Sequence, residues 1–251
     1  MNERIHDDEP DTGESVVREL LRVECPAWAT SQLEYLRSSG TDNAMWRVRV
    51  DGQSDLVVRL PRRSGSAAGV LAETAVLERL EQASISSTVL TPRVRHVGDP
   101  HEVFPHHWSV LEWIDGDDAW ARRHDLARRS LHALAHELAD AICAIRAVDT
   151  DGVRRREPGS RGGPLGPLLD RLDAWLSEAA SDASHLVDVR AVRRFAAEAA
   201  ELVDEPVDET FVHGDLIAGN LLVSGDRLAA ILDWGGAGLG DSAQDLAPAW
   251  S

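Results

Sequence analysis

The sequence predicts an α+β protein in which strands dominate the first part of the chain and helices the second. Alternating apolar and polar residues over 46–50 predict one strand, and the run 56–60, which follows a turn and ends at Pro61, predicts a second. Apolar residues at helical spacing over 131–145 predict a long, well-buried helix, and two short apolar runs within 221–232 predict a β-hairpin. With 251 residues the chain can bury a substantial core, and its size fits one large domain or two lobes.

The first hundred residues read as a disordered end, a short helix and a mainly β region. Residues 1–13 are acidic and polar, so we expect them to be disordered. The Asp51-Gly52 turn joins two strands into a hairpin, because positive φ is accessible there. The turn over 38–43 would cover a nucleotide, although with one glycine it is a weak phosphate-binding signal. The remaining expectations are a short helix from Val16 to Val23, strands at 56–60, 94–97 and 108–111, and a helix over 67–82.

Beyond residue 111 the pattern becomes mainly helical. Helices are expected at 131–145, 167–180 and 188–204. Residues 150–167, TDGVRRREPGSRGGPLGP, are rich in Gly and Pro and predict a loop or an insertion.

Composition excludes several classes of chemistry. The 26 basic and 43 acidic residues give a formal charge of −17, which repels phosphate backbones and argues against nucleic acid. A cationic partner is compatible with this charge, but ordinary surface solvation explains it equally well. The chain has no lysine, so it has neither a P-loop lysine nor a Schiff-base lysine.

Cellular location is suggested by the cysteines and the hydropathy. Cys25 and Cys143 lie far apart in the sequence, which fits reduced thiols better than a disulfide framework. The N-terminus lacks the apolar core of a signal peptide, and no apolar run reaches the length of a membrane span. We therefore expect a cytoplasmic protein without a membrane partner.

The stretch from Phe211 to Ser251 concentrates most of the candidate chemistry. Asp215 follows a strand-like apolar pair, and Asn220 comes five residues later. The hairpin then turns at Ser224-Gly225-Asp226-Arg227, so Asn220 and Asp233 leave from its open end and face one point. Amide and carboxylate oxygens suit Mg²⁺, which takes one or two protein ligands and completes its shell with water and nucleotide phosphates. Asp215 is then free to accept a proton.

These motifs resemble those of the aminoglycoside phosphotransferase family. The resemblance is carried by His213-Gly214-Asp215 with Asn220, by Ile231-Leu232-Asp233-Trp234, and by Gly240-Asp241-Ser242-Ala243-Gln244-Asp245-Leu246-Ala247. It implies that Asp215 is the catalytic base, that Asn220 and Asp233 are the metal ligands, and that Asp245 braces the loop. Ile217-Ala218 and Ser242 depart from the commonest pattern without removing a metal or proton ligand.

The resemblance also assigns roles in the first half of the chain. Arg59 stands where kinases carry the lysine that holds the nucleotide phosphates. Glu73 is the expected carboxylate partner of that cation, with Glu78 as the competing candidate. Glu112, Trp113 and Ile114 resemble the hinge, where backbone atoms would bind the purine.

Together these assignments imply a protein-kinase-like bilobal fold with a mainly β N-lobe and a mainly helical C-lobe. The expected divisions are an N-lobe at 14–111, a C-lobe at 112–251, a hinge at 111–116 and a catalytic segment at 211–247. The implied activity is Mg²⁺-dependent transfer of the γ-phosphate of ATP or GTP to a small-molecule hydroxyl, with an aminoglycoside or another antibiotic as candidate acceptor. A catalytically weak nucleotide-binding regulator of the same fold is the alternative, and a structural module without a nucleotide site is a third.

In the family, several dozen residues follow the Asp-Leu-Ala segment, whereas this sequence stops at Ser251. We therefore expect a C-lobe that is short at its C-terminal end, poor transfer to aminoglycosides and association through that end.

Overall fold

The computed structural model describes residues 9–37, 42–83, 85, 89–182 and 187–250. The chain forms two compact units. The first unit comprises residues 1–138 with 219–235, and the second comprises residues 139–218 with 236–251. The first unit therefore includes the hairpin that lies late in the sequence.

A five-stranded antiparallel sheet forms the first unit's framework, with the strand order β1-β2-β3-β5-β4. The hairpin between β2 and β3 turns near Gly52, whose φ of 71° suits a glycine. The strands are β1 (Gln32–Leu36), β2 (Asn43–Arg49), β3 (Leu56–Pro61), β4 (Val94–Gly98) and β5 (Trp108–Glu112).

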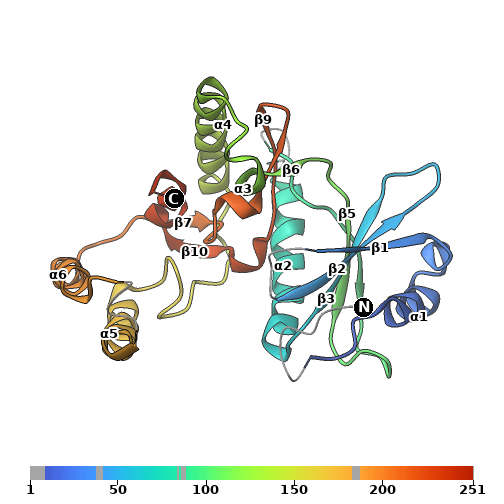
Figure 1. Cartoon of the computed structure of the whole chain (residues 1–251), viewed down its shortest axis with the longest axis horizontal. Coiled ribbons are helices and arrows are strands. Elements are labelled where there is room, and N and C mark those ends of the chain that lie inside the picture. The colour runs from blue at the N-terminus through green and yellow to red at the C-terminus, as the bar shows by residue number, and fades with distance from the viewer. Residues whose placement is uncertain (1–8, 38–41, 84, 86–88, 183–186, 251) are drawn as a thin grey trace. The chain divides into compact units, whose positions relative to one another are not determined.

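Two helices cover opposite faces of this sheet (Figure 1). Helix α1 (Glu14–Glu24) packs its apolar stripe against one face, where Val58 and Trp108 belong to the buried core. Helix α2 (Ser64–Gln82) contacts β3, β4 and β5. Because side chains alternate along a strand, Arg59 points to the face opposite its neighbour Val58. That alternation directs Arg59 to α2.

The predicted hairpin closes with a tight turn at Gly225 and Asp226. Strand β8 (Leu221–Ser224) pairs with β9 (Arg227–Ile231), and the φ of Gly225 is 59°. Strand β6 (Asp117–Asp118) adds to β8 as the third strand of this small sheet, and helix α3 (Ala119–Arg122) follows it. Leu90 forms an isolated bridge with Ala230, which connects the hairpin to the segment before β4 within the first unit.

Helices and one strand pair build the second unit. Strand β7 (Glu209–Val212) pairs antiparallel with β10 (Gly238–Asp241), and α5 (Leu165–Asp182) contacts α6 (Val189–Ala200). Helix α4 (Arg128–Arg146) begins in the first unit and ends in the second. Short 3-10 turns complete the chain at Pro26–Trp28, Ala218–Asn220, Trp234–Gly236 and Ser242–Trp250.

The structure corrects two expectations. Of the N-terminal segment predicted to be disordered, residues 1–8 lie outside the described part, but residues 9–13 pack. Glu9 is buried in an ion pair with Arg62 at 2.8 Å, and the indole of Trp46 donates to the carbonyl of Thr12. The helix over 131–145 is buried only in its second half, at Ala141, Ile142 and Ile145, whereas Leu131 is exposed.

Most predicted elements are present within one to four residues of their expected ends, but β1, β6 and β10 have no counterpart among the predictions. The predicted ligand-covering turn at 38–43 lies outside the described residues at 38–41. The predicted lobe boundary near residue 112 stays a prediction, since the compact units do not follow chain order. Among the described residues, no helix is long and apolar enough to cross a membrane.

Candidate active site

A buried ion pair links the sheet of the first unit to α2. Nη1 of Arg59 lies 2.7 Å from Oε1 and 2.7 Å from Oε2 of Glu73. The side chains are only 12% and 8% exposed. The backbone N–H of Trp234 also donates to Glu73 Oε1 at 3.1 Å. Glu73 therefore connects the cation on β3 to the segment that follows the hairpin.

The charge of Arg59 is secured by its surroundings. Burial by itself would lower the pKa of Arg59, but the nearby charge and hydrogen bond of Glu73, with smaller contributions from Asp233 and Asp42, raise it. Nη2 of Arg59 lies 3.9 Å from Oδ1 of Asp233. One face of the guanidinium is thus held by Glu73 while another approaches the candidate metal ligand.

The hairpin brings the two candidate metal ligands to one end. Leu221 pairs with Ile231, and the N–H of Leu232 donates to the carbonyl of Asn220 at 2.8 Å. Asn220 and Asp233 therefore flank the last rung of the hairpin, as the spacing predicts. Asp233 has a φ of 61°, the one positive value among the described residues other than glycine. The Asp233 side chain is 54% exposed. A left-handed backbone at a residue other than glycine must be maintained by its surroundings, and such residues are common at functional sites.

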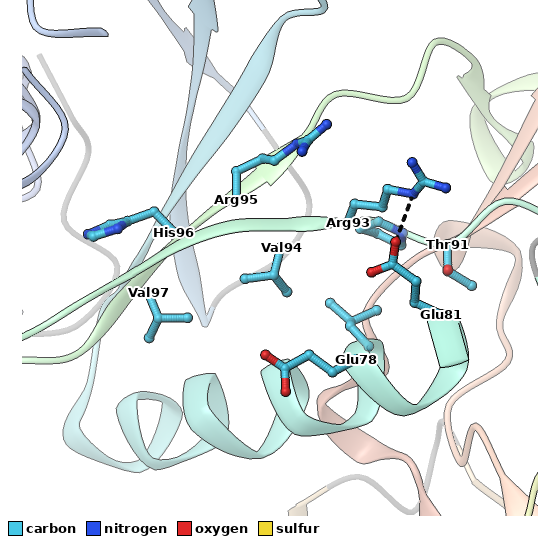
Figure 2. Close-up of a pocket in the computed structure, with 10 residues that line it drawn as sticks. Glu78, Glu81, Thr91, Arg93, Val94, Arg95, His96 and Val97 are labelled. Carbon is cyan, nitrogen blue, oxygen red and sulfur yellow. Dashed lines mark ion pairs between the residues drawn. The ribbon is translucent and has the colours of Figure 1, made fainter. Parts of the chain in front are cut away.

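The structure pairs Glu73, rather than Glu78, with Arg59. Glu78 lines a pocket of about 320 Å³ between α2 and β4, where Arg93 forms an ion pair with Glu81 at 3.5 Å (Figure 2). Glu78 therefore lies on a different face of α2 from the ion pair with Arg59. The competing candidate is not part of the arrangement around Asp233.

Two residues of the predicted hinge already use their backbone N–H groups in hydrogen bonds next to the sheet. The N–H of Glu112 donates to the carbonyl of Arg93, and the N–H of Trp113 donates to the carbonyl of Asp55. The Trp113 ring lies under the guanidinium of Arg47, 4.1 Å from its carbon, and its indole N–H donates to Asp115. Within the described part of the chain, the backbone of Ile114 has no hydrogen-bond partner. Of Glu112, Trp113 and Ile114, Ile114 is therefore the one whose amide is available to a base.

In the second unit, Asp245 holds the loop that carries the candidate base. Its carboxylate is fully buried and accepts the N–H groups of His213 at 2.7 Å and Gly214 at 2.8 Å. His213 Nδ1 in turn accepts the N–H of Asp215 at 3.2 Å. Gly214 has a φ of 82°, and a Cβ there would lie 2.9 Å from the carbonyl oxygen of Gly236. The backbone of this loop therefore requires glycine at position 214.

Sequence reasoning missed two arginines next to this loop. Arg161 forms an ion pair with Asp215, and Nε of Arg156 donates to the carbonyl of Arg161. Burial, the largest influence, lowers the pKa of Arg156, the charge of Arg161 lowers it further, and the charge of Asp245 opposes both. Both arginines belong to the breaker-rich loop at 150–167. The signal that could have found them is the cluster of four arginines, at 154, 155, 156 and 161, in an acidic chain.

The combination of an antiparallel sheet with one braced helix, a carboxylate-ended hairpin and an aspartate loop defines a kinase-like phosphotransferase fold. The model of the phosphotransferase enzyme family matches residues 36–251, so the chain belongs to this family. A comparison with curated proteins found no match.

Solved structures of aminoglycoside phosphotransferases have the same fold. The complex of APH(2'')-IIIa with GDP and kanamycin is 20% identical with a TM-score of 0.70, over 91% of this chain and 75% of that chain. ADP-bound APH(2'')-Ib is 18% identical with a TM-score of 0.62, over 92% and 73%. A thermostable mutant of APH(4)-Ia with AMP-PNP and hygromycin B is 20% identical with a TM-score of 0.63, over 94% and 76%.

Proposed function

We propose that this protein transfers the γ-phosphate of ATP or GTP to a hydroxyl group of a small molecule. The observation that carries the proposal is the buried pair of Arg59 and Glu73, which reaches Asp233 and the N–H of Trp234. Arg59 is held by Glu73 and lies beside the exposed carboxylate of Asp233. This combination of one cation and one exposed carboxylate suits the phosphates of a nucleotide that is bound together with Mg²⁺. Ile114 would supply the backbone contact to the purine.

The residues at the open end of the hairpin fit a magnesium ion. Among the described residues, no cluster of three His, Cys, Asp or Glu side chains could hold a metal ion by itself. Mg²⁺ does not need such a cage, because one or two protein oxygens with water and phosphates complete its octahedron. Asn220 and Asp233 would provide those two oxygens. When bound, the ion would neutralise charge on the phosphates.

In this proposal the remaining chemistry belongs to positioned side chains. Asp215 accepts the proton of the acceptor hydroxyl as its oxygen bonds to the γ-phosphorus and the bond to the β-phosphate oxygen breaks. The loop held by Asp245 fixes the direction of that carboxylate. Arg59 restrains the phosphates through its planar fork, so catalysis is mostly positioning and charge neutralisation.

The related structures suggest a class of acceptor. One is a complex with kanamycin and another is a complex with hygromycin B. Aminoglycosides, and hence antibiotic resistance, are therefore natural candidates to test first. A cytoplasmic location, which gives access to ATP and GTP, belongs to the same proposal and derives from the sequence.

A thermal-shift series tests the nucleotide half of the proposal. We expect ATP or GTP to stabilise the protein only with Mg²⁺, by about 2.7 kcal/mol at a hundred times the dissociation constant. Consumption of nucleotide in the presence of a hydroxyl library then tests transfer. Asp215→Asn should keep the thermal shift and lower turnover by roughly 10² to 10⁴. Tight binding without turnover on any acceptor would favour the regulator, and no shift at all would favour a structural module.

A further inference from the structure

The loop beside the candidate base concentrates positive charge in a chain whose formal charge is −17. Four arginines fall within residues 154–161. Arg154 pairs with Glu157, Arg155 pairs with Glu209, and Arg156 donates to the carbonyl of Arg161. Arg161 is the arginine of this loop that pairs with Asp215. Its position therefore bears directly on what can approach the base.

The backbone around Arg161 is held on both sides. Its carbonyl accepts from Arg156, and the next carbonyl, that of Gly162, accepts the N–H of Asp241 on β10 at 3.0 Å. Gly162 has a φ of 71°, and a Cβ there would lie 3.1 Å from the side chain of Gln244. The guanidinium consequently starts from a fixed point next to the aspartate loop.

The ion pair is open to an incoming molecule. The Arg161 side chain is 64% exposed and that of Asp215 is 30% exposed. Exposed ion pairs contribute little to stability, because water and salt screen them. A competing anion can therefore take the guanidinium without a large loss of stability. Arg156 adds a second guanidinium close by, since its Nη1 lies against Gly214, the residue before Asp215.

From this arrangement, and on the basis of the proposed function, we infer that Arg161 selects acceptors that carry an anionic group near the reacting hydroxyl. A carboxylate or phosphate can accept two hydrogen bonds from the planar fork of an arginine. Such a group would draw Arg161 away from Asp215, and the carboxylate, no longer paired with this arginine, could then accept the hydroxyl proton. A polycationic acceptor would instead meet two guanidiniums and compete with one of them for Asp215.

The phosphate-transfer step itself does not involve Arg161. The acceptor oxygen forms a bond to the γ-phosphorus, the bond from that phosphorus to the β-phosphate oxygen breaks, and the hydroxyl proton passes to Asp215. Arg161 takes no part in bond making. It is a specificity residue that binds the acceptor and controls access to Asp215.

Two sets of acceptors, each sharing a carbon skeleton but differing in charge, test this inference. The first set consists of glucose, glucuronate, glucosamine and glucose 6-phosphate, and the second set consists of glycerol, glycerate and 2-amino-1,3-propanediol. We expect kcat/KM for the anionic members to exceed that for the cationic members by roughly tenfold or more, the effect of one or two hydrogen bonds to a charged group. Comparing glucuronate with glucose 6-phosphate separates carboxylate from phosphate as the recognised group.

Variants at one position sharpen the test. Arg161→Ala should raise KM for the anionic acceptors about tenfold and leave or improve kcat/KM for the cationic ones, so selectivity changes in opposite directions. Arg161→Lys should restore part of the anionic preference, since it keeps the charge but loses the fork. Arg154→Ala is the matched control, because Arg154 is similarly exposed on the same loop but pairs with Glu157. It should change neither class.

Two other outcomes are informative. If cationic acceptors are preferred, or if Arg161→Ala lowers kcat/KM equally for all charges, the inferred role is wrong although the proposed function stands. If no acceptor of any charge consumes nucleotide, the proposed function fails. Thermal shifts with the same sugars, in the presence of Mg²⁺ and a non-hydrolysable nucleotide, would then still report binding, and an absent preference for glucuronate over glucosamine overturns the role of Arg161.

Discussion

Arg59 and Glu73 form a two-point contact, in which one guanidinium nitrogen lies 2.7 Å from each carboxylate oxygen. Both side chains are almost fully shielded from water. Burying two charges is costly unless they are well paired, so the loss of one partner leaves the other uncompensated. The contact therefore supports the fold of the first unit as well as the proposed phosphate site.

The first prediction separates these two roles. Arg59→Ala should lower the free energy of unfolding by about 3 kcal/mol, because Glu73 keeps a buried charge without its partner. Arg59→Met with Glu73→Gln removes both charges and keeps an amide oxygen for the N–H of Trp234, so most of that stability should return. Urea unfolding measures this. Nucleotide affinity should stay weak in both variants, and a normal affinity in the double variant would remove Arg59 from the phosphate site.

Arginine geometry can be tested at the same position. Arg59→Lys should recover only part of the nucleotide affinity lost in Arg59→Ala, because an ammonium is a point charge and cannot offer a planar fork. Titration of ATP in the presence of Mg²⁺ gives the comparison. Complete recovery would mean that any cation suffices at this end of β3.

Replacing Asp233 by glycine should raise the stability of the protein and weaken nucleotide binding. Its φ of 61° is unfavourable for an ordinary side chain, so Asp233→Gly should stabilise the protein by about 1 kcal/mol. The same change removes the candidate metal ligand, so nucleotide affinity and its Mg²⁺ dependence should both fall. Asp233→Asn keeps the backbone cost and loses the charge, which makes it the matched control. If the Mg²⁺ titration curves of Asp233→Asn and the parent protein coincide, Asp233 is excluded as a metal ligand.

Asp245 is predicted to act through the loop and not on the substrate. Its buried carboxylate accepts two backbone N–H groups, and hydrogen bonds to charged groups contribute about 1.5–3 kcal/mol each. Asp245→Ala should therefore destabilise the protein by roughly 3 kcal/mol and lower kcat, while the acceptor KM changes little. Asp245→Asn keeps one acceptor oxygen and should fall between. A large rise in KM with an unchanged kcat would indicate a direct contact instead.

The part of the candidate site that is local in sequence could be predicted well. Asn220 and Asp233 are brought together by one hairpin, whose turn and two apolar runs could be predicted, whereas the register shift between Leu222 and Val223 could not. The strand that carries Arg59 could also be predicted, from a short apolar run that follows a turn and ends at Pro61. The choice of Glu73 over Glu78 required the resemblance, because both carboxylates lie on the same helix.

Contacts between distant segments could not be predicted in this way. Arg161 and Asp215 are 54 residues apart, and Gly and Pro around Arg161 only indicate irregular backbone. Glu9 and Arg62 are 53 residues apart, and a polar segment such as 9–13 is indistinguishable from a disordered one until its partner is known. Strand β10 escaped prediction because its sequence, Gly-Leu-Gly-Asp, carries no alternating pattern.

The last prediction concerns Cys25 and alkaline pH. Burial, and then the neighbouring charge of Glu24, raise the pKa of this thiol to about 11. A thiol that stays protonated in the folded protein but ionises in the unfolded chain stabilises the fold below the unfolded pKa, near 9. That stability should be lost as the pH rises from about 9 to about 11, by up to about 2 kcal/mol.

Few other side chains titrate in this pH range, because the chain has no lysine and one tyrosine. Urea unfolding across pH 8–11 should show the decline in the parent and in Cys143→Ala, whose thiol is exposed, and a much flatter profile in Cys25→Ala. The same slope in Cys25→Ala would assign the alkaline loss to another group.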